Sequence, residues 1–156
     1  MERISKHISY KEGMHSNTAL RRGLNNTPNE SQLKCMGDIA EGLFEPLREW
    51  VGGPIKITSM FRGEPVNTAI GGSKNSQHMK GQALDLDDTY KYKTNAEMYH
   101  YIKDNLDFDQ MIWEFGDDEN PNWIHVSYVT HRENRKKLTI AYKDKGRTKY
   151  KHEEKK

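Results

Sequence analysis

Cysteine and long hydrophobic segments are almost absent from this sequence. Cys35 is the one cysteine among 156 residues, which excludes intramolecular disulfides and cysteine-rich zinc fingers. No stretch approaches the ~18 consecutive apolar residues of a membrane span, and the opening MERISKHISYKEG lacks the apolar run of a signal peptide. We therefore expect a protein without a membrane span that is cytoplasmic when it is synthesised.

Apolar residues are scarce as well. They make up 33% of the chain, and with the 12 glycines added the total is still below the ~45–50% usual for globular proteins. A chain of 156 residues suffices for one domain and is short for two. We predict a single domain over residues 1–142 with a small core.

Positive charge is unevenly distributed along the chain. The net charge is +2, but residues 143–156 alone contain seven Lys and Arg against three Asp and Glu. We interpret residues 143–156 as a basic, flexible tail. A nucleic-acid-binding domain usually carries basic residues on its folded part, so we expect no nucleic-acid partner. Binding of nucleic acid through the tail is the alternative.

The spacing of apolar residues predicts an α+β fold. Apolar side chains recur every three or four residues from Ser31 to Trp50, which predicts an amphipathic helix. Pro46 interrupts this pattern, so we expect a kink near Gly42. A second helix is predicted over residues 94–105.

Short strands are predicted around the second helix. Alternating or continuous apolar runs indicate strands at residues 55–59, 82–87, 109–115, 123–129 and 137–142. We expect these strands to form a small antiparallel sheet flanked by helices. The long loop 61–80, with one helical turn at 64–70, is of a kind that usually carries function.

Two segments contain side chains suited to bind a metal. SQHMKGQALDLD at 76–87 contains His78 and Asp85, and NWIHVSY at 122–128 contains His125. Two imidazoles and one carboxylate match the protein ligands of a catalytic zinc site, whose fourth position stays open. Spacing alone leaves the question open, because a His on a strand is more often a hydrogen-bonded or surface residue.

The same two segments resemble the signature of a known enzyme family. The pattern SxHxxGxAxD from Ser76 to Asp85, followed by WxHVS at 123–127, is similar to that of the zinc D-Ala-D-Ala carboxypeptidase and L-Ala-D-Glu endopeptidase family. This family shares its fold with the hedgehog signalling domain. The resemblance runs from ISYKE at 8–12 to HVSY at 125–128 and looks strongest to small phage and bacterial peptidases. It implies that His78, Asp85 and His125 bind Zn²⁺.

Hydrolysis also needs a base, for which we select Glu114. This residue lies in QMIWEFG, on the strand before that of His125, so hairpin pairing would bring its carboxylate near the metal. Hedgehog-like members of the family have a Glu at a matching place. Other relatives carry the acid where this sequence has Asn122, which leaves Asp118 and Glu119 as alternatives. A plain surface carboxylate is the other interpretation of Glu114.

Two further residues are expected to contact the substrate. Arg62, in SMFR, matches the family's substrate-binding Arg, and its guanidinium can hold a carboxylate or offset charge that develops on the attacked carbonyl. We therefore count Arg62 as both catalytic and substrate-binding. Ser76 would add a hydrogen bond to the bound peptide. Trp123 occupies the place where certain relatives have a His that stabilises the transition state.

The resemblance implies a zinc-dependent peptidase that hydrolyses a bond in the peptide stem of bacterial peptidoglycan. Both an L-Ala-D-Glu endopeptidase, of the endolysin kind, and a D-Ala-D-Ala carboxypeptidase are compatible with the motifs. We expect a monomer that reaches the cell wall after release from the cytoplasm. A non-catalytic zinc-containing binding module of the same fold is the alternative.

Overall fold

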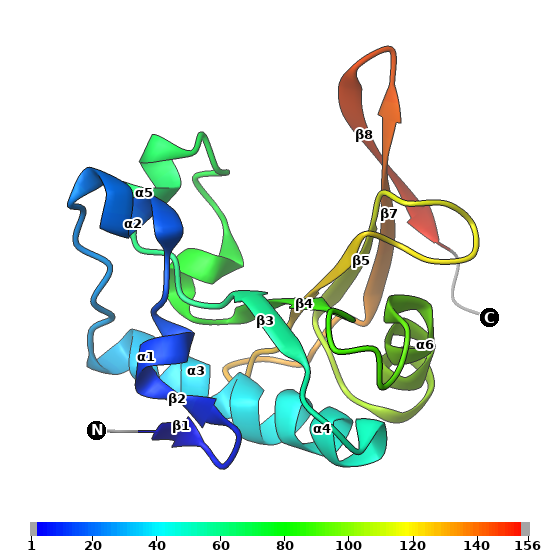
Figure 1. Ribbon diagram of the computed structural model, residues 1–156, viewed down its shortest axis with the longest axis horizontal. Helices are drawn as coiled ribbons and strands as arrows, with labels where there is room; N and C mark the ends of the chain where they lie inside the picture. The colour runs from blue at the N-terminus through cyan, green and yellow to red at the C-terminus, as the bar shows by residue number, and fades with distance from the viewer. Residues whose placement is uncertain (1–2, 154–156) are drawn as a thin grey trace.

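A six-stranded sheet lies at the centre of the computed structural model, which describes residues 3–153 (Figure 1). The strand order is β3-β4-β6-β5-β7-β8, and each neighbouring pair is antiparallel except β5 and β7, which are parallel. The strands are β3 (Lys56–Ser59), β4 (Ala83–Asp87), β5 (Gln110–Glu114), β6 (Trp123–Ser127), β7 (Lys137–Asp144) and β8 (Arg147–Glu153).

The predicted α+β class is confirmed, although the sheet is larger than expected and not wholly antiparallel. The parallel pair arises because the end of β6 lies beside the start of β5, where the amide of Asp109 donates to the carbonyl of Ser127. The short link 128–136 then places the start of β7 beside the start of β5, with Lys137 opposite Gln110. Hydrophobic alternation cannot reveal strand direction, so the sequence did not predict this pairing.

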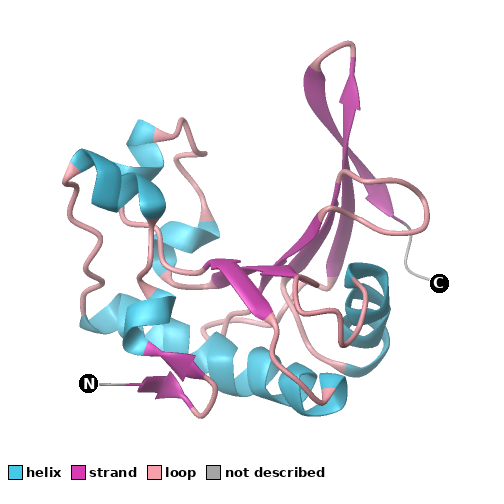
Figure 2. Ribbon diagram, in the orientation of Figure 1, coloured by secondary structure: helices cyan, strands magenta, loops and turns pink. Residues whose placement is uncertain are grey.

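The long helical segments lie on one side of the sheet (Figure 2). Apolar residues of α3, η1, α4 and α6 form one buried cluster with Leu84, Leu86, Ile124, Val126 and Met111. Strand pairing places these sheet residues on one face, so the helices leave the other face free for a site. The helical segments are α1 (Tyr10–Gly13), α2 (Asn17–Arg22), α3 (Glu30–Ile39), η1 (Ala40–Phe44), α4 (Glu45–Val51), α5 (Glu64–Ala69), η2 (Gln77–Lys80) and α6 (Asn95–Asn105).

The expected irregularity near Gly42 is present as a π-helical turn. Helix α3 continues through the π-turn η1 into α4, and Pro46 stands in the first turn of α4. A π-turn changes the hydrogen-bond spacing, which accommodates the amide that proline lacks. A Cβ at Gly42 would lie 2.5 Å from Cζ of Tyr128, so a larger residue there would displace the Tyr128 ring.

The two ends of the described chain contain structure that the sequence did not predict. A short ribbon of β1 (Arg3–Ser5) and β2 (Ile8–Ser9) precedes α1. At the other end, residues expected in a flexible tail form the second half of the β7–β8 hairpin, and 154–156 lie outside the described residues. Lys145 and Gly146 form its turn with φ values of 52° and 79°, as a two-residue primed turn requires. Strand β8 was not predicted because its residues are mostly charged and give no hydrophobic alternation.

No helix within residues 3–153 is long and apolar enough to cross a bilayer.

A buried carboxylate fixes the link between β6 and β7. The Asp109 side chain has no exposed surface and accepts hydrogen bonds from Arg132, Arg135 and Gln77. Burial alone would raise the pKa of Asp109, but the hydrogen bonds from the two arginines outweigh it and hold that pKa well below its usual range. The ionised Asp109 therefore stabilises the folded protein at neutral pH. This stabilisation decreases in acid, once the aspartate of the unfolded chain becomes protonated below about pH 4.

We predict that Asp109→Asn lowers the free energy of unfolding by about 3 kcal/mol near neutral pH, because two arginines lose their shared carboxylate. Urea unfolding measures this change, and the difference from the wild type should narrow at about pH 3. Asp144→Asn is the control: it removes an exposed ion pair with Lys149 and should cost under about 0.5 kcal/mol. Equal effects of the two substitutions would contradict the prediction.

Candidate metal centre

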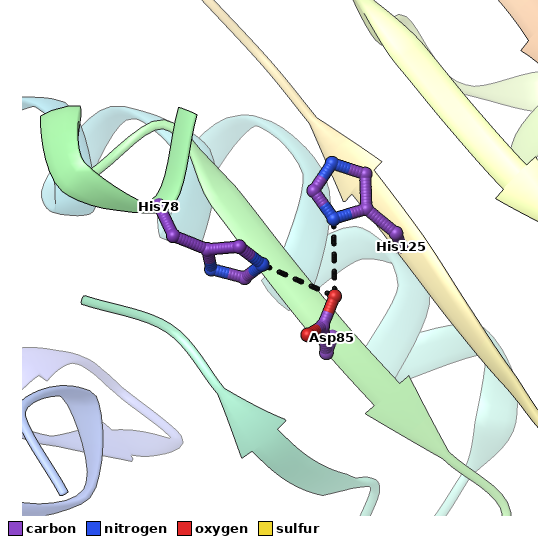
Figure 3. Close-up of side chains that lie close together, drawn as sticks. All are labelled: His78, Asp85 and His125. Carbon is purple, nitrogen blue, oxygen red and sulfur yellow. Dashed lines mark hydrogen bonds and ion pairs between the residues drawn. The ribbon is translucent and has the colours of Figure 1, made fainter. Parts of the chain in front are cut away.

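His78, Asp85 and His125 meet on the open face of the sheet (Figure 3). Asp85 on β4 is directly opposite His125 on β6, and His78 approaches from the 3-10 turn η2. One potential ligand atom from each residue lies within 4.8 Å of the other two. Within residues 3–153, no other group of three or more His, Cys, Asp or Glu residues meets the same distance limit.

The backbone fixes the orientation of the His78 ring. Its Nδ1 lies 2.8 Å from the carbonyl oxygen of Met60, so this nitrogen carries the proton and donates it. Nε2 points the other way: it is buried, lies 3.2 Å from Oδ1 of Asp85 and has no hydrogen-bond partner among the described protein atoms. Gly81 ends η2 at φ 75°, and a Cβ there would lie 2.4 Å from the carbonyl oxygen of Gln32.

Asp85 is held in its ionised form. Its Oδ1 lies 3.1 Å from Nδ1 of His125 as well as close to His78. Burial alone would raise the pKa of Asp85, but the electrostatic attraction of the two nearby imidazoles, His78 and His125, outweighs it and keeps that pKa well below its usual range. The site therefore offers a carboxylate rather than a carboxylic acid.

These donors fit a zinc ion. Two imidazoles and one carboxylate are a common ligand set for catalytic zinc, and the ring of His78 has the backbone acceptor that zinc-binding histidines usually have on their second nitrogen. A bound cation would also give the buried Nε2 of His78 the partner that the described protein atoms do not provide. A closed structural site would need a fourth protein ligand.

A cavity of about 330 Å³ opens over the three residues. Its lining includes all the residues that the sequence selected: Arg62, Ser76, His78, Asp85, Glu114 and His125. A larger cavity of about 470 Å³ lies between α6 and the β7–β8 hairpin and contains none of them. The chemistry of the lining identifies the smaller cavity as the candidate site.

Glu114 lies at the end of β5, directly opposite Trp123 on β6. Its side chain is largely buried, and this burial raises the pKa of Glu114 to about 7, with a smaller lowering effect from His125 and a further raising effect from Asp85. A carboxyl group with a pKa near neutrality can both accept and release a proton at physiological pH. Its position and its pKa suit the predicted role of base and acid.

Neighbouring side chains hold Arg62 at the wall of the cavity. Its Nε donates to Oδ1 of Asn67 at 3.0 Å, and its Nη2 donates to Oγ of Ser76 at 3.1 Å. The Arg62 amide also donates to the carbonyl of His78, which ties the two residues together. A guanidinium fixed in this way presents its remaining N–H groups to a ligand in the cavity at little entropic cost.

Ser76 has two partners inside the protein. Its Oγ accepts from the amide of His78, which caps η2, and from Arg62. These bonds position a predicted ligand and a predicted substrate-binding residue. A hydrogen bond from Ser76 to substrate stays a prediction.

The alternative acids lie outside the cavity over the three residues. Asp118 lines the larger cavity instead, and Glu119 is an exposed residue of the turn after β5. The acidic pair Asp87 and Asp88, which follows Asp85, accepts hydrogen bonds from Asn95 at the start of α6. These carboxylates therefore have structural partners or face solvent.

The sequence did not predict the residues that fix Arg62 and its neighbouring backbone in place. Asn67 fixes Arg62, and the buried Asn26 bonds the carbonyl of Phe61 and the amide of Gly63 on either side of it. An asparagine in a polar loop gives no signal in a single sequence, because its role depends on backbone groups brought close only by folding.

Most of the chain matches a known family. The model described as Peptidase M15 matches residues 6–127, a range that contains all three potential metal ligands, Arg62 and Glu114. No curated protein matches the chain.

We predict that Glu114→Gln stabilises the metal-free protein at alkaline pH. The raised pKa means that the folded chain resists ionisation of Glu114, so its stability falls as pH rises from about 4.5 to about 7. Glutamine does not ionise, and with chelator present the variant should be more stable than the wild type by roughly 2 kcal/mol at about pH 8 and equal to it near pH 4. Thermal unfolding at both pH values measures the difference.

The control for this measurement is Glu119→Gln, which removes an exposed carboxylate and should change stability little at either pH. A Glu114→Gln effect of the same size at both pH values would show that Glu114 does not titrate as described.

Proposed function

Because the chain belongs to the peptidase M15 family, we propose that it is a zinc-dependent peptidase that hydrolyses a bond in the peptide stem of bacterial peptidoglycan. The observation that carries the proposal is the meeting of His78, Asp85 and His125 in one cavity with Glu114. A purely structural metal site would have no need of a buried acid with a pKa near 7 beside it.

His78, Asp85 and His125 would hold the zinc ion. When bound, zinc supplies a Lewis acid that polarises the carbonyl of the scissile bond. The carbonyl of Met60 keeps Nδ1 of His78 protonated, so that Nε2 is the nitrogen available as ligand.

Glu114 would move the proton. Its carboxylate accepts a proton from the attacking water and then delivers it to the departing amine, for which a pKa near 7 is well suited. The low exposure of the side chain keeps bulk water away from this transfer.

Arg62 would hold the substrate on the amine side of the cut bond. In both bonds under consideration, L-Ala-D-Glu and D-Ala-D-Ala, the residue that supplies the departing amine carries a free carboxylate. A guanidinium restrained by Asn67 and Ser76 can bind such a group through two N–H donors. All the groups come from one chain, so we propose a monomer that acts on the wall after its release from the cytoplasm.

We predict that His78→Ala abolishes zinc binding, because it removes one of only three protein ligands. Elemental analysis by mass spectrometry should find about one zinc per wild-type chain and almost none in the variant. His131→Ala, which removes an exposed His outside the cavity, should keep its zinc. An unchanged zinc content in His78→Ala would refute the ligand set.

We also predict that the wild type releases products from purified muropeptides and that Glu114→Gln is slower by about 10²- to 10⁴-fold while it retains zinc and fold. Mass spectrometry of the digest, with and without chelator, identifies the cut bond and its metal dependence. Glu119→Gln should retain activity, since Glu119 lies outside the cavity. Zinc-loaded wild type without any product would favour the non-catalytic binding module.

A further inference from the structure

One wall of the cavity comes from a segment that the family model does not cover. The match ends at residue 127, whereas Tyr150 lies on β8 and lines the cavity together with Glu114 and His125. Tyr150 is 61% exposed, so it is available for contact with a ligand. The β7–β8 hairpin extends beyond the rest of the sheet (Figure 1).

Strand register places Tyr150 on the same face as Glu114. Tyr150 is paired with Ala141 on β7, and Ala141 is paired with Glu114 on β5. Directly paired residues point to the same face of a sheet, and two strand spacings correspond to about 10 Å. A peptide that occupies the site near Glu114 therefore lies within reach of the Tyr150 ring.

The cavity extends from one side of the sheet to the other. Arg62 follows β3 at one edge, and Tyr150 is on β8 at the other edge. Asp85, His125 and Glu114 lie on the strands between them. A substrate whose amine-side carboxylate binds Arg62 must therefore direct its acyl side toward β8.

We propose that Tyr150 binds the acyl side of the substrate, meaning the residues or sugar that precede the cut bond. The proposal rests on the proposed peptidase function and adds a specificity-determining residue to it. An aromatic ring offers a rigid apolar surface on which peptide or sugar C–H groups can pack, and tyrosine is often an anchor residue in binding sites. The contact needs the ring rather than the hydroxyl.

The test compares steady-state kinetics of wild type, Tyr150→Ala, Tyr150→Phe and Tyr142→Ala on purified disaccharide-linked stem peptide. Tyr150→Ala should lower kcat/KM by about tenfold, mainly through KM, while Tyr150→Phe stays within about twofold of the wild type. Tyr142→Ala is the matched control. It removes a tyrosine of the same hairpin that lines the other cavity, so it should leave the kinetics unchanged.

A second substrate with the acyl side truncated to the single residue before the cut bond tests the location of the contact. The defect of Tyr150→Ala should shrink to less than about twofold, because the group that packs on the ring is gone. The same tenfold defect on both substrates, or no defect on either, would overturn the assignment. So would an equal loss in Tyr142→Ala, which would indicate a general weakening of the hairpin.

The activity of the wild type distinguishes failure of the Tyr150 assignment from failure of the proposed peptidase function. Cleavage by the wild type with unchanged kinetics in Tyr150→Ala refutes the role of Tyr150 and leaves the peptidase function intact. Absence of cleavage by the zinc-loaded wild type refutes the peptidase function and, with it, the role of Tyr150.

Discussion

The direct pairing of Asp85 and His125 across β4 and β6 is the constraint on which the site depends. It sets two of the three potential ligands side by side through backbone hydrogen bonds, without any flexible loop between them. The third, His78, is positioned by a hydrogen bond to the backbone carbonyl of Met60. Because sheet and turn geometry fix all three, the cluster is preorganised and a metal can bind with little rearrangement.

The two faces of the sheet have different roles: one packs in the hydrophobic core, and the other carries the candidate site. The helices cover the apolar face, and the opposite face carries the polar cavity. Burial of Glu114 there raises its pKa to about 7, which weakens the fold at alkaline pH but provides an acid-base group suited to hydrolysis. The helix-covered core and the buried Asp109 network supply stability that offsets this cost.

The local sequence pattern predicted the strands that carry the site residues. It did not predict features that depend on contacts between segments far apart in the sequence. The alternation around Asp85, Glu114 and His125 indicated their strands, because every second residue of a half-buried strand faces the core. That the three residues share one face of the sheet depends on strand pairing, which alternation does not specify. The parallel placement of β7 and the strand that contains Tyr150 were missed. Strand direction leaves no periodic signal, and the lysines of β8 are typical of a solvated tail.

The proposed peptidase function requires one zinc ion bound by His78, Asp85 and His125. Diffraction data collected on either side of the zinc absorption edge test it most directly. We expect a single anomalous peak within coordination distance of Nε2 of His78, the Asp85 carboxylate and His125, with no fourth protein ligand. Absence of the peak from crystals grown with zinc, or a fourth protein ligand at it, would contradict the account.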